Sequence, residues 1–210
     1  MMQNETSPQW LTWAREIQAL SQTGLAFNEP GYDTDRYVRL TEIAAEIIAG
    51  HTSVPTAEAL ASFSAQPGYA TVKVDVRGAV VQDGKILLVQ ERRDERWCMP
   101  GGWADIGDKP SEMVAREVWE ESGFDVKPAG IIGVYDANRS QTPTEFFHAY
   151  KIVFMCDITG GQARTSDETM DVGFFDPQSL PPLSECRTNN RHIADVVAHW
   201  KDPSKQPIFD

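Results

Sequence analysis

The residues best suited to chemistry are three glutamates with helical spacing. Glu117, Glu120 and Glu121 stand at positions i, i+3 and i+4. In a helix this spacing places their carboxylates on one face, with neighbouring Cβ atoms about 5–6 Å apart. Like charges so placed, near the negative C-terminal end of the helix dipole, destabilise the bare helix. We therefore expect a hard divalent cation, which prefers oxygen ligands, to compensate them.

The segment around these glutamates has the start and stop signals of a helix from Pro110 to Ser122. Proline fits the first turn of a helix, and Gly123 fits the left-handed residue that ends one. Arg116 is expected to hold a carboxylate in place through a forked hydrogen bond. The face opposite the glutamates is apolar and is expected to pack on a sheet through Met113, Val114 and Val118.

The loop before this helix combines glycines with an acidic residue. Gly101 and Gly102 carry no Cβ atom, so their backbone can approach a ligand closely, and we assign both to substrate binding. The loop then bends back towards the carboxylates, which places Asp108 at the helix entrance. Asp108 has two expected roles, as a cap of the helix and as a further metal ligand.

Three residues outside the helix complete the predicted site. Arg92 and Arg96 lie between a predicted strand and the glycines, where they are expected to meet phosphate or ribose. A solvated loop that uses its own acidic residues as ion partners is the alternative. Glu168 lies in the polar stretch 166–171, just before another predicted strand, and is the candidate general base. An ordinary solvated acid is the other interpretation of Glu168.

The strands and helices that would position this site occupy residues 67–210. Residues 72–77 alternate valines with charged residues, which predicts a strand whose charges share one face. Asp83-Gly84 lies between two apolar runs and is the strongest short-range signal of a β-hairpin. Further strands are predicted at 131–135, 146–156 and 172–175, and a last helix at 189–200. Helices with a mixed sheet between them place the fold in the α/β (α+β) class.

Residues 1–66 have a different pattern and predict a separate helical extension. Apolar residues recur with helical period over 8–22 and 33–49, and Gly24 and Gly50 are expected to end these two helices. A third short helix is expected over 55–63, with Pro55 in its first turn. Three short helices bury little apolar surface by themselves. We therefore expect this extension to pack on the domain of residues 67–210, or on a second copy of the chain in a homodimer.

Charge and composition narrow the class of protein. The chain carries a formal net charge of −12 over 210 residues, which argues against a nucleic-acid binder and so against a DNA partner. No stretch approaches the ~20 apolar residues that span a bilayer, and the polar start lacks the pattern of a secretory signal. Three cysteines without metal-ligand spacing are expected to be reduced thiols of a cytoplasmic protein.

Residues 102–124 resemble the Nudix box, G-x5-E-x7-R-E-U-x-E-E-x-G-U, in which U is apolar. The matching residues are Gly102, Arg116, Glu117, Val118, Glu120, Glu121, Gly123 and Phe124. Asp108 stands where the family has its first glutamate. The resemblance implies a Nudix fold and a small-molecule nucleotide substrate. It also implies Mg²⁺ as the cofactor, with Mn²⁺ as a substitute, held by Glu117, Glu120 and Glu121.

The implied activity is hydrolysis of the diphosphate linkage between a nucleoside and a second group X, to a nucleoside monophosphate and X-phosphate. Glu120, Glu121 and Arg116 would then act in catalysis together with Glu168, since relatives take the general base from the box or from a later loop. Residues 1–66 also resemble the helical extension of bacterial ADP-ribose and CDP-choline pyrophosphatases. The alternatives are a nucleoside triphosphate pyrophosphohydrolase and a non-catalytic, nucleotide-sensing regulator.

Overall fold

The structure is a computed structural model that describes residues 8–29, 31–137 and 147–210. It divides into two compact units. The helical unit consists of the described residues of Met1–Val72 with Phe147 and His148, and the sheet unit consists of Lys73–Ala137 and Ala149–Asp210. Residues 1–7, whose polarity argued against a secretory signal, and Phe146, where a strand was predicted to begin, lie outside the described residues.

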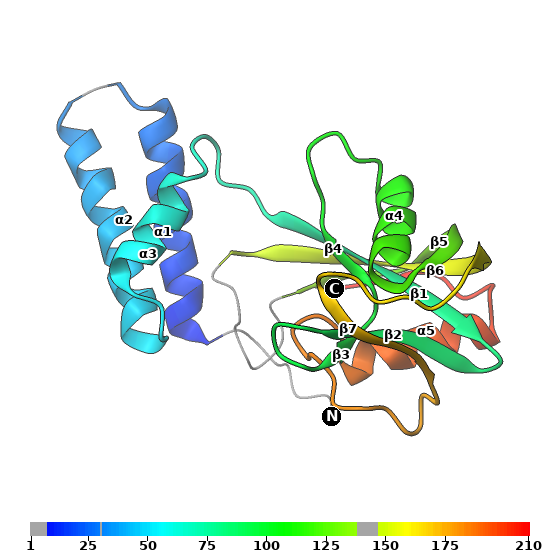
Figure 1. Cartoon of the computed structure of the whole chain (residues 1–210). Coiled ribbons are helices and arrows are strands. Elements are labelled where there is room, and N and C mark those ends of the chain that lie inside the picture. The colour runs from blue at the N-terminus through cyan, green and yellow to red at the C-terminus, as the bar shows by residue number, and fades with distance from the viewer. Residues whose placement is uncertain (1–7, 30, 138–146) are drawn as a thin grey trace. The chain divides into compact units, whose positions relative to one another are not determined.

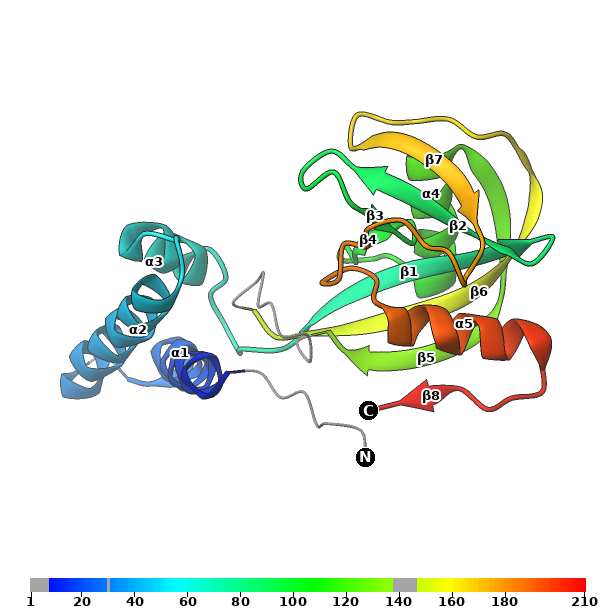
Figure 2. The ribbon, with the colours of Figure 1, turned by 90° about the horizontal axis from the view of Figure 1, so that it is seen from below.

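The helical unit contains α1 (Gln9–Phe27), α2 (Tyr32–His51) and α3 (Thr56–Ser64). Its helices lie side by side in both ribbon views (Figures 1 and 2). Their shared core is rich in alanine, which lets helices approach closely, and consists of Leu11, Ala14, Ala44, Ala45, Ile48, Ala59 and Phe63. The ring of Phe147 packs edge-on against Phe63, with ring centroids 6.3 Å apart.

Two glycines of the helical unit do not end their helices as predicted. Gly24 lies inside α1, where a Cβ atom would come within 2.4 Å of the Tyr37 ring on α2. This glycine therefore does not form a turn, and its missing side chain leaves space for the Tyr37 ring. Gly50 also lies inside its helix, which continues to His51. At Gly24, packing between helices has overridden the local preference of glycine for a helix end, whereas no neighbouring atom of the described residues lies within 4 Å of a Cβ atom built at Gly50.

The sheet unit is built on a mixed sheet, which confirms the predicted α/β class. Its strands are β1 (Lys73–Gln82), β2 (Lys85–Glu91), β3 (Trp97–Cys98), β4 (Gly101–Trp103), β5 (Phe124–Asp136), β6 (Ala149–Gly161), β7 (Thr169–Phe175) and β8 (Ile208–Phe209). The order is β3-β2-β1-β6-β5-β8, with β4 paired to β1 and β7 paired to β2. The β1–β6 and β5–β8 pairs are parallel, and the other pairs are antiparallel.

The predicted hairpin joins β1 to β2, with Asp83 and Gly84 at φ 51° and 76°. Positive φ at both central residues gives the turn the twist that matches its strands.

Two helices cover opposite faces of this sheet, α4 (Pro110–Ser122) and α5 (Asn190–Lys201). The residues packed with α4 are Val76, Val80, Leu87, Phe154 and Cys156, and those packed with α5 include Ala79, Ile86, Leu88, Ile132 and Val153. Successive residues of β1 and β2 thus face different helices, so these strands are buried on both sides. Figure 2 shows α5 along the sheet near β5 and β8.

Helix α4 lies close to the sheet because β1 carries a glycine beneath it. A Cβ atom at Gly78 would come within 2.4 Å of the Val118 side chain and 3.3 Å of Val114. The missing side chain lets the buried face of α4 sit on the centre of the sheet. The distance between α4 and the sheet thus determines where the glutamates of α4 lie relative to the strands.

No helix in the described part of the chain is both long and apolar enough to cross a membrane. The three cysteines, Cys98, Cys156 and Cys186, are free thiols, as expected from their spacing.

Candidate active site at helix α4

Helix α4 has the predicted bounds, and its ends fix the direction of its acidic face. Pro110 occupies the first turn. Gly123 adopts φ 79°, and a Cβ atom there would lie 2.4 Å from the carbonyl oxygen of Gln162. The left-handed φ of Gly123 ends the right-handed helix, and the missing side chain lets the chain turn directly into β5 beside Gln162. The glutamates of the last two turns are therefore held next to β4 and the start of β7.

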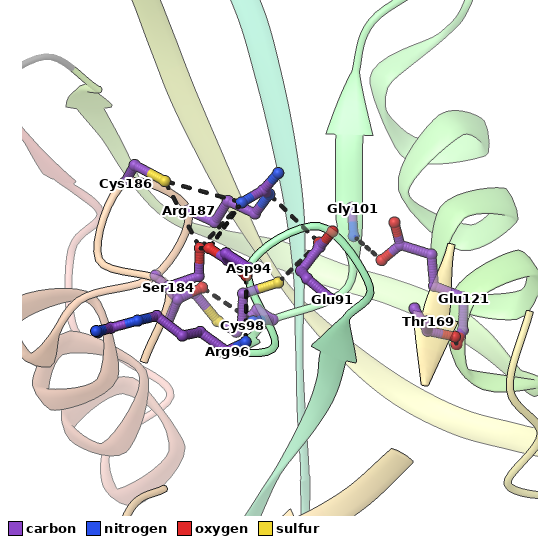
Figure 3. Close-up of polar contacts among 12 residues, drawn as sticks. Glu91, Asp94, Arg96, Cys98, Gly101, Glu121, Thr169, Ser184, Cys186 and Arg187 are labelled. Carbon is purple, nitrogen blue, oxygen red and sulfur yellow. Dashed lines mark hydrogen bonds and ion pairs between the residues drawn. The ribbon is translucent and has the colours of Figure 1, made fainter. Parts of the chain in front are cut away.

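Glu121 is the most buried of the three glutamates, with 6% of the residue exposed. Its Oε2 atom accepts a hydrogen bond from the backbone N–H of Gly101 at 2.9 Å (Figure 3). Burial raises the pKa of Glu121 to about 8, against the opposing effects of the Arg77 guanidinium and the Gly101 N–H. The ionised carboxylate thus has too little positive charge around it, which a bound cation would correct.

Glu117 lies one turn earlier, with its side chain 14% exposed and its Oε1 atom 3.0 Å from Nη1 of Arg116. Burial raises its pKa, the Arg116 charge lowers it, and the charges of Glu120 and Glu168 raise it further. The segment that carries Glu168 is joined to α4 through its neighbour Thr169, whose hydroxyl donates to the main-chain carbonyl of Glu121 at 2.9 Å. Two elements that are 51 residues apart in the chain, counted from Glu117 to Glu168, are thus brought together.

Arg116 contacts more of the predicted site than a single carboxylate. Its Nη2 atom lies 2.9 Å from Asp108, and its Nη1 atom lies 3.0 Å from Glu117 and 3.4 Å from Glu120. Asp108 does not cap α4, as had been predicted, because its carboxylate is bound to Arg116. The N-cap residue is Lys109, which provides no side-chain hydrogen bond.

The acids have the chemistry of a site for a hard divalent cation, since their donors are all carboxylate oxygens. No group of three His, Cys, Asp or Glu side chains within residues 8–29, 31–137 and 147–210 is already arranged to hold a metal ion. In the structure Arg116 binds Glu117 and Glu120, and the backbone N–H of Gly101 binds Glu121. A metal ion bound by Glu117, Glu120 and Glu121 would therefore compete with Arg116 for the first two of these carboxylates.

The glycines assigned to substrate binding also have structural tasks. Gly101 adopts φ 143°, and a Cβ atom there would lie 2.0 Å from the carbonyl oxygen of Val76. A Cβ atom at Gly102 would lie 3.1 Å from Oε2 of Glu117. Both glycines therefore let β4 fit between β1 and the glutamates. Their contact with a substrate stays a prediction.

The two arginines assigned to substrate binding donate to main-chain carbonyl groups. Nε of Arg92 lies 2.9 Å from the carbonyl oxygen of Asp167, and Nη1 of Arg96 lies 3.3 Å from that of Leu183. Each guanidinium thus holds a loop next to the site. A role in binding phosphate or ribose stays a prediction for both residues.

A buried charge network was not expected from the sequence. Asp75 and Arg77 were placed on the charged face of a strand, yet both residues are buried, and Nε of Arg77 lies 3.0 Å from Oδ1 of Asp75. Nζ of Lys151 is buried beside the same carboxylate at 3.3 Å and donates to the carbonyl of Cys186 at 2.8 Å. Arg77 is also the cation that most favours ionised Glu121. The only sign of this network in the sequence was that Asp75 and Arg77 lie between valines of one predicted strand.

A second polar network joins the end of β2 to the loop before α5 (Figure 3). Arg187 lies 3.3 Å from Glu91 through Nε and 3.3 Å from Asp94 through Nη1. The thiol of Cys98 donates to Glu91 at 3.2 Å, and burial raises its pKa well above the usual value. Glu91 in turn raises the pKa of Glu121, so this network borders the site. Arg187 lies more than 90 residues from Glu91 and from Asp94 in the chain, so the sequence carried no local signal of these two ion pairs.

Family models match both parts of the chain. The model of the NUDIX domain matches residues 72–196, and the model of the UDP-X-like, N-terminal oligomerisation domain matches residues 8–63. The Bacillus subtilis protein YjhB, by name a candidate ADP-ribose pyrophosphatase, is 39% identical over 201 residues, which cover 96% of this chain and 97% of YjhB.

Solved structures agree in fold. A UDP-X diphosphatase is 29% identical, with a TM-score of 0.62, and the match covers 96% of this chain and 98% of that one. An ADP-ribose pyrophosphatase of Streptococcus suis is 33% identical, with a TM-score of 0.61, and the match covers 67% of this chain and all of that one.

Proposed function

Because the chain belongs to the Nudix family of hydrolases, we propose that it is a Mg²⁺-dependent enzyme that splits the diphosphate linkage of a nucleoside diphosphate joined to a second group. Family membership makes it an enzyme of diphosphate hydrolysis. The metal, the substrate and the individual roles of the site residues are the content of the proposal.

The observation that carries the proposal is the placement of three carboxylates on one side of α4, next to the glycines of β4. Glu117 and Glu121 are both buried enough for their pKa values to rise. A protein that used these acids only for stability would gain nothing from burying them without a full partner. A site that receives a cation together with an anionic substrate accounts for the arrangement.

The chain's own residues would divide the reaction between them. Bound at Glu117, Glu120 and Glu121, Mg²⁺ would supply charge neutralisation at the diphosphate and activation of water. Glu168 takes a proton from the attacking water, whose oxygen bonds to one phosphorus while the bond from that phosphorus to the bridging oxygen breaks. The bridging oxygen leaves on the second phosphate, which gives a nucleoside monophosphate and X-phosphate. Asp108 and Arg116 hold the ligands in place.

The names of the relatives order the candidate substrates. ADP-ribose comes first, because it is the substrate named for YjhB and for the Streptococcus suis structure. A UDP-linked compound follows, from the UDP-X diphosphatase that matches nearly the whole chain. CDP-choline is the third, from the resemblance of residues 1–66. Nucleoside triphosphates are the competing class.

A substrate panel tests the function directly. The purified full chain is incubated with Mg²⁺, Mn²⁺ or EDTA and with ADP-ribose, CDP-choline, a UDP-sugar, NADH, a diadenosine polyphosphate or a nucleoside triphosphate. We expect kcat/KM to be highest for ADP-ribose, with AMP and ribose phosphate as products and no turnover in EDTA. Pyrophosphate release from triphosphates as the fastest reaction would instead favour the alternative class.

We further propose that residues 1–66 form the contact of a homodimer and that the protein works in the cytoplasm, where its three thiols stay reduced. The helical unit exposes large apolar side chains at Trp13, Leu20 and Phe27. Exposed apolar surface of this kind favours association. Light scattering of the full chain is expected to give twice the monomer mass, and Leu20→Glu is expected to lower it. A monomeric full chain contradicts the dimer.

A further inference from the structure

Arg92 directly follows β2 and makes three hydrogen bonds to three consecutive residues, the last two of the loop before β7 and the first of β7. Its backbone N–H donates to the carbonyl oxygen of Glu168 at 2.9 Å. Its side chain donates to the two neighbouring carbonyls, from Nε to Asp167 at 2.9 Å and from Nη2 to Thr169 at 3.3 Å. One arginine thus binds the backbone before, at and after Glu168. The side chain of Glu168 is left to project from a held backbone.

The same loop is attached to the box helix from the other side. Thr169 is fully buried, and its hydroxyl donates to the main-chain carbonyl of Glu121 at 2.9 Å (Figure 3). The backbone N–H of Ser166 donates to the same hydroxyl at 2.9 Å, and the N–H of Glu168 donates to the Ser166 hydroxyl at 3.2 Å. The loop is therefore fixed between the end of β2 and the end of α4, the part of α4 that carries Glu121.

The contacts of Arg92 differ from those of a residue that recognises substrate. A guanidinium that binds phosphate typically offers the anion two parallel N–H groups. In Arg92, Nε and Nη2 are already engaged by carbonyl oxygens of the loop. A planar fork that meets two carbonyls of one turn restrains the backbone between them, which a single ammonium group does less well.

We propose that Arg92 is a positioning residue that holds the Glu168 carboxylate in line with the water it deprotonates, and that Arg92 does not bind substrate. The inference rests on the proposed function, in which Glu168 is the general base. The sequence assigned Arg92 to substrate binding, whereas here Arg92 acts on the reaction indirectly, by holding the backbone of Glu168.

The test is a double-mutant cycle on the full chain with its best substrate at saturating Mg²⁺. Glu168→Gln is expected to lower kcat roughly 10²–10⁴-fold, the range for loss of a general base. Arg92→Ala is expected to lower kcat about tenfold to a hundredfold with KM unchanged, since a misplacement of about 1 Å can cost ~100-fold. The double variant is expected to match Glu168→Gln alone, because a base that is absent cannot be misplaced.

Two further variants separate positioning from charge and from folding. Arg92→Lys keeps the charge but lacks the fork, so its kcat is expected to fall nearly as far as that of Arg92→Ala. Arg93→Ala removes the same charge from the exposed neighbouring residue and is expected to behave as the parent protein. Thermal unfolding of each variant shows whether it is folded at the assay temperature, and Arg92→Lys replaces Arg92→Ala in the cycle if the latter is not.

Each contrary result has a separate meaning. A raised KM with unchanged kcat in Arg92→Ala would return Arg92 to substrate binding. A further loss of kcat in the double variant would make its role a general structural one. Normal activity of Arg92→Ala beside an inactive Glu168→Gln overturns the inference alone. Normal activity of Glu168→Gln overturns the assignment of the base and the inference with it, while hydrolysis by the metal site stands.

Discussion

Glu121→Gln is expected to lower kcat about a thousandfold, because charge stabilisation by a bound metal contributes several kcal/mol and each ~1.4 kcal/mol is a factor of ten. Glutamine has nearly the same volume and can still accept the hydrogen bond that the Gly101 N–H donates to Glu121. The fold is therefore expected to survive while the negative charge is lost. Glu120→Gln is expected to act in the same direction.

The same change is expected to leave the metal-free protein as stable as the parent or more so. The folded state raises the pKa of Glu121 from 4.5 to about 8, chiefly through burial. Between these values the folded state binds more protons than the unfolded state, so the parent loses stability as pH rises. Glutamine does not titrate and escapes this loss. The stability difference between the variant and the parent should therefore grow from pH 4.5 to 8.

A matched control lies on the same helix. Glu112 is exposed and pairs with Lys109 at 2.7 Å, away from the buried acids. Glu112→Gln makes the same chemical change and is expected to alter neither kcat nor the pH dependence of stability. Steady-state kinetics with Mg²⁺, and urea unfolding in EDTA across this pH range, measure both effects. Near-normal kcat in Glu121→Gln would remove the metal site from the proposal.

Gly101→Ala is expected to destabilise the fold by about 3 kcal/mol or more, since overpacking and a strained backbone each cost about 1–3 kcal/mol. The added Cβ atom would lie 2.0 Å from the carbonyl oxygen of Val76, at a backbone φ of 143°. Relief of this contact requires β4 to move away from β1, which also withdraws the N–H that binds Glu121. A typical domain has only about 5–15 kcal/mol of stability in total.

Gly102→Ala is the control for this substitution, one residue further along β4. Its Cβ atom would meet only the flexible end of Glu117, at 3.1 Å from Oε2. We expect unfolding within about 1 kcal/mol of the parent and a reduced kcat, because Glu117 must shift. Urea unfolding monitored by tryptophan fluorescence compares the two variants. Equal stability of Gly101→Ala and Gly102→Ala would show that the close contact with Val76 is not present in solution.

Local signals in the sequence were sufficient for the box helix and the hairpin. Pro110 and Gly123 mark the ends of α4 by their own backbone preferences, and the structure has the predicted bounds. Asp83-Gly84 forms the turn of the hairpin for the same reason. In each case the deciding interaction lies within a few residues of the chain, which is the range that spacing and residue type report.

Pairings between distant segments required the tertiary structure. The sequence could not show that Gly24 meets Tyr37, that Asp108 binds Arg116 instead of capping α4, or that the short strands β3, β4 and β8 exist. The energies of such contacts depend on which segments the fold brings together, and short strands have too few residues for a period to appear.

The sequence by itself determined the acidic face of α4 and with it the family and its chemistry, since one helix turn is enough to align three carboxylates. The tertiary structure alone decided how deeply these acids are buried, which arginine side chains lie near them, and which contacts hold the backbone of Glu168. Arg77 and Arg92 reach the site only through the pairing of β1 and β2 with β4 and β7. Such neighbours cannot be read from any short segment, because burial and charge pairing arise only when distant segments pack together.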